Sequence, residues 1–455
     1  MSVLNNSAQY IRSLCDDAGT RLRSGDISWR DELSTWHAQA RENTDPFSRD
    51  DSLLRLALLE SALADLDGRG QDCLDSLKRA LDLIAQQKSR VQDADQLHRL
   101  HDQEWTLRLN FTQALRSLGR YDDAQAQVNL LEELAPDTLN PAHRTLATKL
   151  EFAALSMSRE HYYQAAETYR SLQPLCRSSA PEFLGVVLLG TAQADMMLGD
   201  FAAAELNLNR AEPLLGADPT HIASLQHARA YLSLFASDPL DTPMRSFLSG
   251  EISSEAVAID PRLAKQAALM QGHHQHVEGR VEDALHAFES LESLAFEHNG
   301  LPFLADVLQR SACVHQDLAL TIADVNEASA HHRTALRKLT QARAIRLSGG
   351  HELSTASIDV TSADFLVQWH ELHRAVTTEE LNQALKSIIL AVRTLFRASE
   401  SIQETRTRHE FVRMRLQHAY EVACTLAFLL GNTRILSALI IESSARYDWR
   451  ATQTA

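Results

Sequence analysis

A turn motif flanked by small residues recurs along this chain, and this repetition constrains the fold more than any other feature. Its clearest copy is Gly119-Arg-Tyr-Asp-Asp-Ala124, which separates two helix-forming stretches. Glycine suits the end of the first helix, because a left-handed backbone costs glycine nothing. Tyr121 can wedge between the helices, and Ala124 lets their backbones approach. The motif therefore predicts a hairpin of two helices.

The same pattern occurs five times when the turn residue is used as the anchor. The anchors are Gly68, Gly119, Glu160, Gly199 and Gly279. Seven positions before each anchor stand the small residues Ser61, Thr112, Ala153, Ala192 and Gly272, and five positions after it stand Cys73, Ala124, Ala165, Ala204 and Ala284. The ninth positions after the anchors are Leu77, Val128, Tyr169, Leu208 and Phe288, and the twelfth are Ala80, Leu131, Leu172, Ala211 and Leu291. Small residues where two helices cross, and larger ones where one pair meets the next, are what stacked hairpins require.

These residues resemble the tetratricopeptide repeat family over roughly residues 50–300. The resemblance implies an all-α, right-handed α-solenoid of helical hairpins. Successive anchors lie 51, 41, 39 and 80 residues apart, and the last interval equals two periods, so a degenerate unit is expected near Ser237–Leu240 and Phe247. The family's usual period is about 34 residues. We therefore expect longer helices or longer loops between repeats.

Three regions are predicted along the chain. Residues 1–47, with Trp29 and Trp36, form an N-terminal helical cap, and residues 48–300 form the solenoid, with a hinge in the proline-containing stretch 237–261. Residues 301–455 continue the solenoid with long helices, because no proline follows Pro302.

Local signals divide this C-terminal region further. A break is expected at Leu347–Ser357, with re-entry into helix near Ser362, and a capping signal starts a helix at Thr377-Thr-Glu-Glu380. Ser401–Leu430 and Thr433–Ser444 are expected to form the last helical pair, joined at Gly431-Asn432.

Charge and cysteine usage bear on the setting in which the protein acts. The net charge is −16, with acidic and basic residues interspersed, so direct binding to nucleic acid is not expected. The five cysteines are scattered without paired spacing, which is typical of a reduced, cytoplasmic protein. Ala427–Ile441, the longest apolar stretch, is interrupted by Gly431 to Arg434, so no membrane span is expected. The sequence does not define an oligomeric state.

The end of the chain carries a second, shorter resemblance. Ala419-Tyr-Glu-Val-Ala, Leu430-Gly-Asn-Thr and Leu436-Ser-Ala-Leu-Ile-Ile-Glu442 are similar to the helical arrays that precede the caspase-like domain of bacterial CHAT peptidases. This resemblance implies a separate sensor or scaffold of a peptidase-linked stress or defence system. The partner would then be a CHAT-type peptidase or its complex.

Candidate partner-binding residues lie on the first helix of each pair, which lines the groove of such solenoids. The predicted contacts are polar residues and methionines at two register positions of that helix: Gln113, Arg116, Met157, Gln193, Met196, His273 and His276. Some co-chaperones of this family clamp the C-terminal carboxylate of a partner with Lys at one position of this helix and Asn at another. This chain has Leu at the first of these positions and mostly Ala or Gln at the second, so that clamp is not expected. The leucines of this face, such as Leu58 and Leu109, can equally be packing residues between neighbouring pairs.

Catalytic chemistry finds little support in the residues. His273-His-Gln-His276 and His370/His373 place imidazoles three residues apart, but zinc needs further ligands, and no cysteine pair lies nearby. There is no Gly-x-Ser-x-Gly elbow, and Gly349-Gly350 lacks the Lys-Ser/Thr of a phosphate loop. We predict no catalytic residues, no metal and no cofactor. The arginines between Arg393 and Arg415 are interleaved with glutamates, which favours ion pairs within helices over a phosphate track.

The sequence thus predicts a non-catalytic scaffold or adaptor that binds a protein or peptide on its concave face. The alternative is a regulator that senses a small molecule or signal peptide in a pocket controlled by the hinge. An enclosed pocket favours the sensor, whereas an open groove with apolar surface favours the adaptor.

Overall fold

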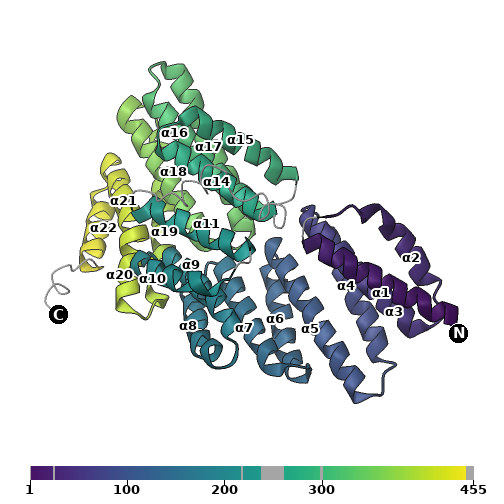
Figure 1. Cartoon of the computed structure of the whole chain (residues 1–455). Coiled ribbons are helices and arrows are strands. Elements are labelled where there is room, and N and C mark those ends of the chain that lie inside the picture. Colours follow the sequence, from purple (N-terminus) through teal and green to yellow (C-terminus); the bar gives the residue numbers. More distant parts are fainter. Residues whose placement is uncertain (1, 24–25, 217–218, 237–260, 298–300, 447–455) are drawn as a thin grey trace. The chain divides into compact units, whose positions relative to one another are not determined.

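The computed structural model describes residues 2–23, 26–216, 219–236, 261–297 and 301–446 (Figure 1). In these ranges the chain forms helices joined by short turns, and it forms no strand. The expected all-α solenoid of tetratricopeptide-like hairpins is confirmed. The chain divides into two compact units, which are described separately. The first unit comprises residues 1–192, 205–270 and 294–301, and the second comprises 193–204, 271–293 and 302–455.

The N-terminal helices pack on the first hairpin. Helix α1 (Ser2–Arg23), a 3-10 turn (Arg30–Glu32) and α2 (Leu33–Arg41) precede α3 (Pro46–Leu66). The rings of Trp29 and Trp36 stack with centroids 6.0 Å apart, and together with Leu56 and Leu63 of α3 they belong to one apolar cluster. The two tryptophans thus cover an apolar face of α3, which would otherwise end the stack exposed to water.

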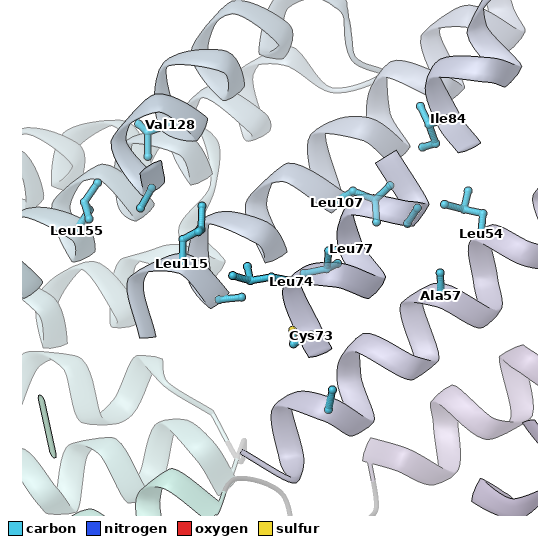
Figure 2. Close-up of a cluster of buried hydrophobic side chains, with 14 of the residues drawn as sticks. Leu54, Ala57, Cys73, Leu74, Leu77, Ile84, Leu107, Leu115, Val128 and Leu155 are labelled. Carbon is cyan, nitrogen blue, oxygen red and sulfur yellow. The ribbon is translucent and has the colours of Figure 1, made fainter. Parts of the chain in front are cut away.

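Three hairpins follow in the first unit. They are α3 with α4 (Gly70–Lys88), α5 (Ala94–Ser117) with α6 (Tyr121–Leu134), and α7 (Pro141–Ser158) with α8 (Tyr162–Ser179). Figure 1 shows these helices side by side in chain order, and each packs on the next. Figure 2 shows the core that results: side chains from Leu54 on α3 to Leu155 on α7 form one continuous apolar cluster. Helices of 19 to 24 residues in α4 and α5 account for the long interval between the first two anchors.

The middle of the chain continues this pattern. It contains α9 (Leu184–Leu198), α10 (Phe201–Ala211), α11 (Pro219–Ala236), α14 (Pro261–Val277) and α15 (Val281–Glu297). The predicted hinge at 237–261 and the degenerate unit near Phe247 fall almost entirely outside the described residues.

All twenty positions of the sequence template are buried. The five anchors all have positive φ, from 64° to 85°, including Glu160, the one anchor that is not glycine. Small residues are required where the paired helices cross: a Cβ added to Gly272 would lie 2.8 Å from the Phe288 ring. The template therefore describes the helix crossings of this fold.

Four long helices follow one another, almost entirely within the second unit. They are α16 (Leu301–Thr321), α17 (Val325–Ser348), α18 (Glu352–His373) and α19 (Thr378–Ser401), each 21 to 24 residues long. Asp324 caps α17 by accepting hydrogen bonds from the backbone amides of Asn326 and Glu327. The predicted capping box of α19 is confirmed, because Thr377 accepts from the Glu380 amide and the Glu380 carboxylate accepts from the Thr377 amide.

Two expectations for this region are wrong. Helix resumes at Glu352, and not near Ser362, because Gly350 at φ 73° needs only residues 349–351 to reverse the chain. The expected helix from Ser401 to Leu430 is divided into α20 (Thr405–Phe411), a π-helical turn (Val412–Leu416) and α21 (Gln417–Leu429). Ile402 is buried at the break, and its carbonyl oxygen accepts a hydrogen bond from Arg408 Nε at 2.8 Å.

The last hairpin turns where it was expected. Gly431 has φ 63°, and the side chain of Asn432 accepts a hydrogen bond from the Ile435 amide at the start of α22 (Thr433–Arg446).

Candidate partner-binding site

The residues predicted to contact a partner are distributed over both units. Gln113 and Arg116 lie on α5 and Met157 lies on α7, all in the first unit. The second unit contains the other four: Gln193 and Met196 on α9, and His273 and His276 on α14. Each of these residues lies on the first helix of a hairpin, as the register implies.

In the first unit, Gln113 and Arg116 converge on one carboxylate. Arg116 Nε lies 2.9 Å from Glu151 Oε1, and Gln113 Nε2 lies 3.4 Å from Glu151 Oε2. Glu151 lies on α7 and is only 5% exposed. A buried carboxylate needs such donors, because water cannot solvate it. These contacts join the first helices of two successive hairpins, so Arg116 is engaged within the chain.

The leucines of this face also make intramolecular contacts. Leu58 packs against the cluster that runs from α3 to α7, and Leu109 packs against the smaller cluster of Trp105, Leu131 and Ala135. In the second unit, Met196 is buried, with 4% exposure, whereas Gln193 is partly exposed. Packing between hairpins thus accounts for several of these apolar side chains.

The two histidines line a pocket in the second unit. Its volume is about 400 Å³, and its walls are His273, His276 and Val277 of α14 and Arg310, Cys313 and Asp317 of α16. Residues three and four apart share one face of a helix, and so do residues seven apart. The pocket is therefore a segment of groove between the first helices of successive hairpins.

The electrostatics of this pocket begin with Arg310 and His273. Arg310 Nη1 lies 3.2 Å from His273 Nε2. A guanidinium only donates, so the imidazole must accept and therefore remain neutral. Burial, assisted by the Arg310 charge, lowers the pKa of His273 to about 3. The ring thus holds the guanidinium in place without cancelling its charge.

The other end of the pocket is acidic. Asp317 Oδ2 lies 2.7 Å from His276 Nε2, and the aspartate side chain remains 57% exposed. Val277, next to His276 in the pocket wall, is 64% exposed. Burial raises the pKa of the Cys313 thiol to about 11, so this cysteine is a neutral wall residue and a poor nucleophile at pH 7. The arrangement provides a cation, an anion and apolar surface for a ligand.

Half of this pocket was not predicted from the sequence. Arg310, Cys313 and Asp317 belong to α16, which follows the last recognised anchor, so the repeat register did not mark them. The one signal in the sequence is their spacing: Cys313 and Asp317 lie three and seven residues after Arg310, which indicates a shared helix face.

The histidine-rich segments do not form a metal centre in the described part of the chain. There, no group of three or more His, Cys, Asp or Glu side chains is placed to hold an ion. The second histidine pair has an aromatic environment: His373 lies against Trp369, with ring centroids 3.9 Å apart, and His332 stacks on the same indole.

No family model matches this chain, and no curated protein matches it in sequence. A STAND-class signal transduction ATPase with a tetratricopeptide repeat sensor, from Pyrococcus horikoshii, resembles its structure with a TM-score of 0.42 and 13% identity, over 88% of this chain and 56% of that one. This chain thus spans little more than half of that ATPase. The human IFIT1 dimer with PPP-AAAA has a TM-score of 0.37 and 15% identity, over 93% of this chain and 98% of that one. Yeast Tom70 has a TM-score of 0.34 and 13% identity, over 98% of this chain and 99% of that one.

These scores are too low to transfer a function or a site to this chain. The fold assignment depends on the helices and the burial described above. A separate finding concerns membranes: across the described residues, no helix combines the length and the apolar character needed to cross a bilayer.

Proposed function

We propose that this chain is a non-catalytic scaffold that holds a protein or peptide partner on the first helices of its hairpins, with the pocket between α14 and α16 as the main contact. The observation that supports this most is the convergence of the predicted His273 and His276 with Arg310 and Asp317 around exposed Val277. Binding sites typically combine apolar surface with a few convergent polar groups.

The remaining predicted contact residues differ in how accessible they are to a partner. Gln113, Met157 and Gln193 are at least partly exposed and can meet a partner without rearrangement. Arg116 and Met196 are weaker members, because Arg116 pairs with Glu151 and Met196 is buried.

A more specific form of the proposal gives the scaffold a place in a bacterial, cytoplasmic stress or defence system. There it would act as the sensor or regulatory subunit of a CHAT-type peptidase. Its support is the sequence resemblance of the region 419–442, which folds as α21 and α22.

The alternative function is a regulator that senses a small molecule or a signal peptide. The same pocket supports this alternative, because its volume of about 400 Å³ can accommodate a small ligand. Such a sensor needs two states with different affinity for the ligand.

Capture of partners from the native cytoplasm tests the proposal. The tagged wild-type protein should retain one stoichiometric protein, identified by mass spectrometry. Val277→Arg fills the pocket from an exposed position and should lose this protein, whereas Val325→Arg, at a similarly exposed valine of α17, should retain it. If Val277→Arg keeps the partner, the proposed site is wrong. If the wild type retains only a small molecule, the sensor function replaces the scaffold.

A further inference from the structure

We infer that the groove between α14 and α16 selects an extended peptide segment with an acidic side chain and a basic side chain three positions apart. This inference rests on the proposed function and specifies the partner's chemistry. The acidic side chain would meet Arg310, and the basic one would meet Asp317.

Arg310 provides the first half of this selectivity. Among the residues that the structure describes, no carboxylate forms an ion pair with it, and its hydrogen-bond partner is the His273 ring. By contrast, Arg343 and Arg346 of the next helix pair with Asp359 and Asp306. A guanidinium that lines a pocket and has no carboxylate partner can bind a carboxylate of a ligand, often through two parallel hydrogen bonds.

Neighbouring acidic groups do not fill this role. Glu278, one residue beyond the pocket wall, pairs with Arg280 and also lies 3.0 Å from His274 Nε2. Asp317 is in contact with His276. The cationic end of the pocket is therefore left for a ligand.

Asp317 provides the second half. Its Oδ2 contacts His276, while Oδ1 accepts no hydrogen bond from any described residue. The His276 imidazole adds charge only when it is protonated, so in its neutral form it orients the aspartate and leaves the negative charge in place. A ligand ammonium or guanidinium can then pair with the exposed oxygen.

The rise of α16 between Arg310 and Asp317 gives the expected spacing in the ligand. Arg310 and Asp317 are seven residues apart on one helix face, which corresponds to about 10 Å along the axis. In a polyproline II segment, residues three apart lie on the same side and about 9 Å from each other. Residues one or two apart span only about 3 or 6 Å in this conformation, and residues four or five apart span about 12 or 16 Å.

The wall between the charged ends favours apolar residues in the middle of the motif. Cys313 lies between Arg310 and Asp317 on the same face of α16, and Val277, which is 64% exposed, adds apolar surface to the pocket wall beside His276. The inferred motif is thus one acidic residue, two apolar residues and one basic residue in extended conformation.

Synthetic peptides test this inference directly. The probes are fluorescein-labelled octapeptides with blocked ends, in which one Glu and one Lys stand one to five positions apart, in both orders, among Pro, Val and Ala. Anisotropy titrations with the full-length protein should show tightest binding at a separation of three, about tenfold tighter than at a separation of one.

Variants assign each end of the pocket. Arg310→Gln should remove the preference for Glu over Gln in the peptide, and Asp317→Asn should remove the preference for Lys over Gln. Where the wild type prefers one order of charges along the peptide, the double variant Arg310→Glu/Asp317→Lys should prefer the other. Circular dichroism checks that each variant is folded, and Arg393→Gln, which removes an exposed arginine of α19, is the matched control.

The results separate this inference from the proposed function. Affinities that do not depend on charge spacing, or that Arg310→Gln leaves unchanged, overturn the inference. If the native partner is nevertheless captured and lost in Val277→Arg, the scaffold function stands without the inferred motif. If Val277→Arg keeps the partner, the proposed site itself fails.

Discussion

At the scale of single residues, the left-handed backbone of two turns favours glycine, so removing glycine from one turn and adding it to the other should have opposite effects on stability. Gly119 has φ 75° and open space around it, so Gly119→Ala should lower the free energy of unfolding by about 1 kcal/mol through backbone strain alone. Arg374 adopts φ 53° at the exposed C-terminal cap of α18, so Arg374→Gly should raise it by about 1 kcal/mol. Urea unfolding followed by circular dichroism measures both.

A glycine inside a helix is the control for this pair. Gly19 lies inside α1 and also has open space around it, so Gly19→Ala should stabilise the helix by about 0.5–1 kcal/mol. If Gly119→Ala is as stabilising as Gly19→Ala, the turn at Gly119 does not need a left-handed residue.

Residue-level features were also the ones that the sequence predicted best. The template placed Glu160 at a turn anchor from register alone, and its φ is 64°, as at the glycine anchors, although glutamate disfavours this conformation. All twenty template positions are buried, because close helix crossings restrict side-chain size at fixed offsets from the turn. The roles of Arg116 and Arg310 could not be predicted in this way, since each depends on a group that lies at least 35 residues away in the chain.

Buried histidines make stability depend on pH. His332 stacks on Trp369 and contacts Gln316 Oε1 through Nδ1 at 2.9 Å, and burial lowers the pKa of His332 to about 4. An unfolded histidine titrates near 6.5, so on acidification the unfolded chain binds a proton first. Stability should therefore fall from pH 7 towards pH 4, by at most about 1.4 kcal/mol per pH unit for this group, and level off below.

Thermal unfolding at a series of pH values checks this dependence. His332→Gln should flatten the loss of stability between pH 7 and pH 4.5, whereas His98→Gln, at an exposed histidine of α5, should not. Parallel curves for His332→Gln and the wild type would contradict the assignment.

At the scale of helices, the contact of Arg116 with Glu151 joins α5 to α7. Arg116→Ala leaves the buried Glu151 carboxylate without its guanidinium, so the free energy of unfolding should fall by about 1–3 kcal/mol. Adding Glu151→Gln should recover part of this loss, because a neutral amide costs less to bury. Arg120→Ala, which breaks an exposed pair with Asp123, should cost less than about 0.5 kcal/mol.

Hydrogen exchange of α5 and α7 locates the effect. Faster exchange in both helices of Arg116→Ala is expected. If exchange and stability are unchanged, Arg116 is free to contact a partner, and its position in the proposed binding face becomes stronger.

Helix boundaries could be predicted where a local sequence signal sets them. They could not be predicted where a tertiary contact sets them. The capping box of Thr377 and Glu380 needs only four residues, and it is present as predicted. The π-helical turn Val412–Leu416 was not predicted, because residues in it and in the preceding helix contact the end of α9 and the turn after it, about 200 residues earlier in the chain. Within the second unit, Arg415 Nη2 lies 3.4 Å from the Met197 carbonyl oxygen, and Arg406 Nη2 lies 3.4 Å from Asp200 Oδ1.

At the scale of the whole molecule, the same distinction applies to the pocket. His273 and His276 could be predicted because they hold fixed positions relative to the Gly279 anchor. Arg310 and Asp317 lie beyond the last anchor, where long helices carry no repeat signal. The period of a solenoid predicts which side chains are buried and which helix faces the groove. It does not predict which charges two successive helices bring together.

The modular core predicts that damage in one hairpin stays local. Ala124 is fully buried where α5 and α6 cross, so Ala124→Arg should open this hairpin and raise hydrogen exchange from α4 to α7. Each hairpin of a solenoid is stabilised mainly by its neighbours, so α17 to α19 in the second unit should keep their protection. Ala126→Arg, two residues away on the exposed face of α6, should change neither. Loss of protection throughout the chain would instead mean that the two units unfold as one cooperative body, and the pocket of the second unit would then respond to changes in the first.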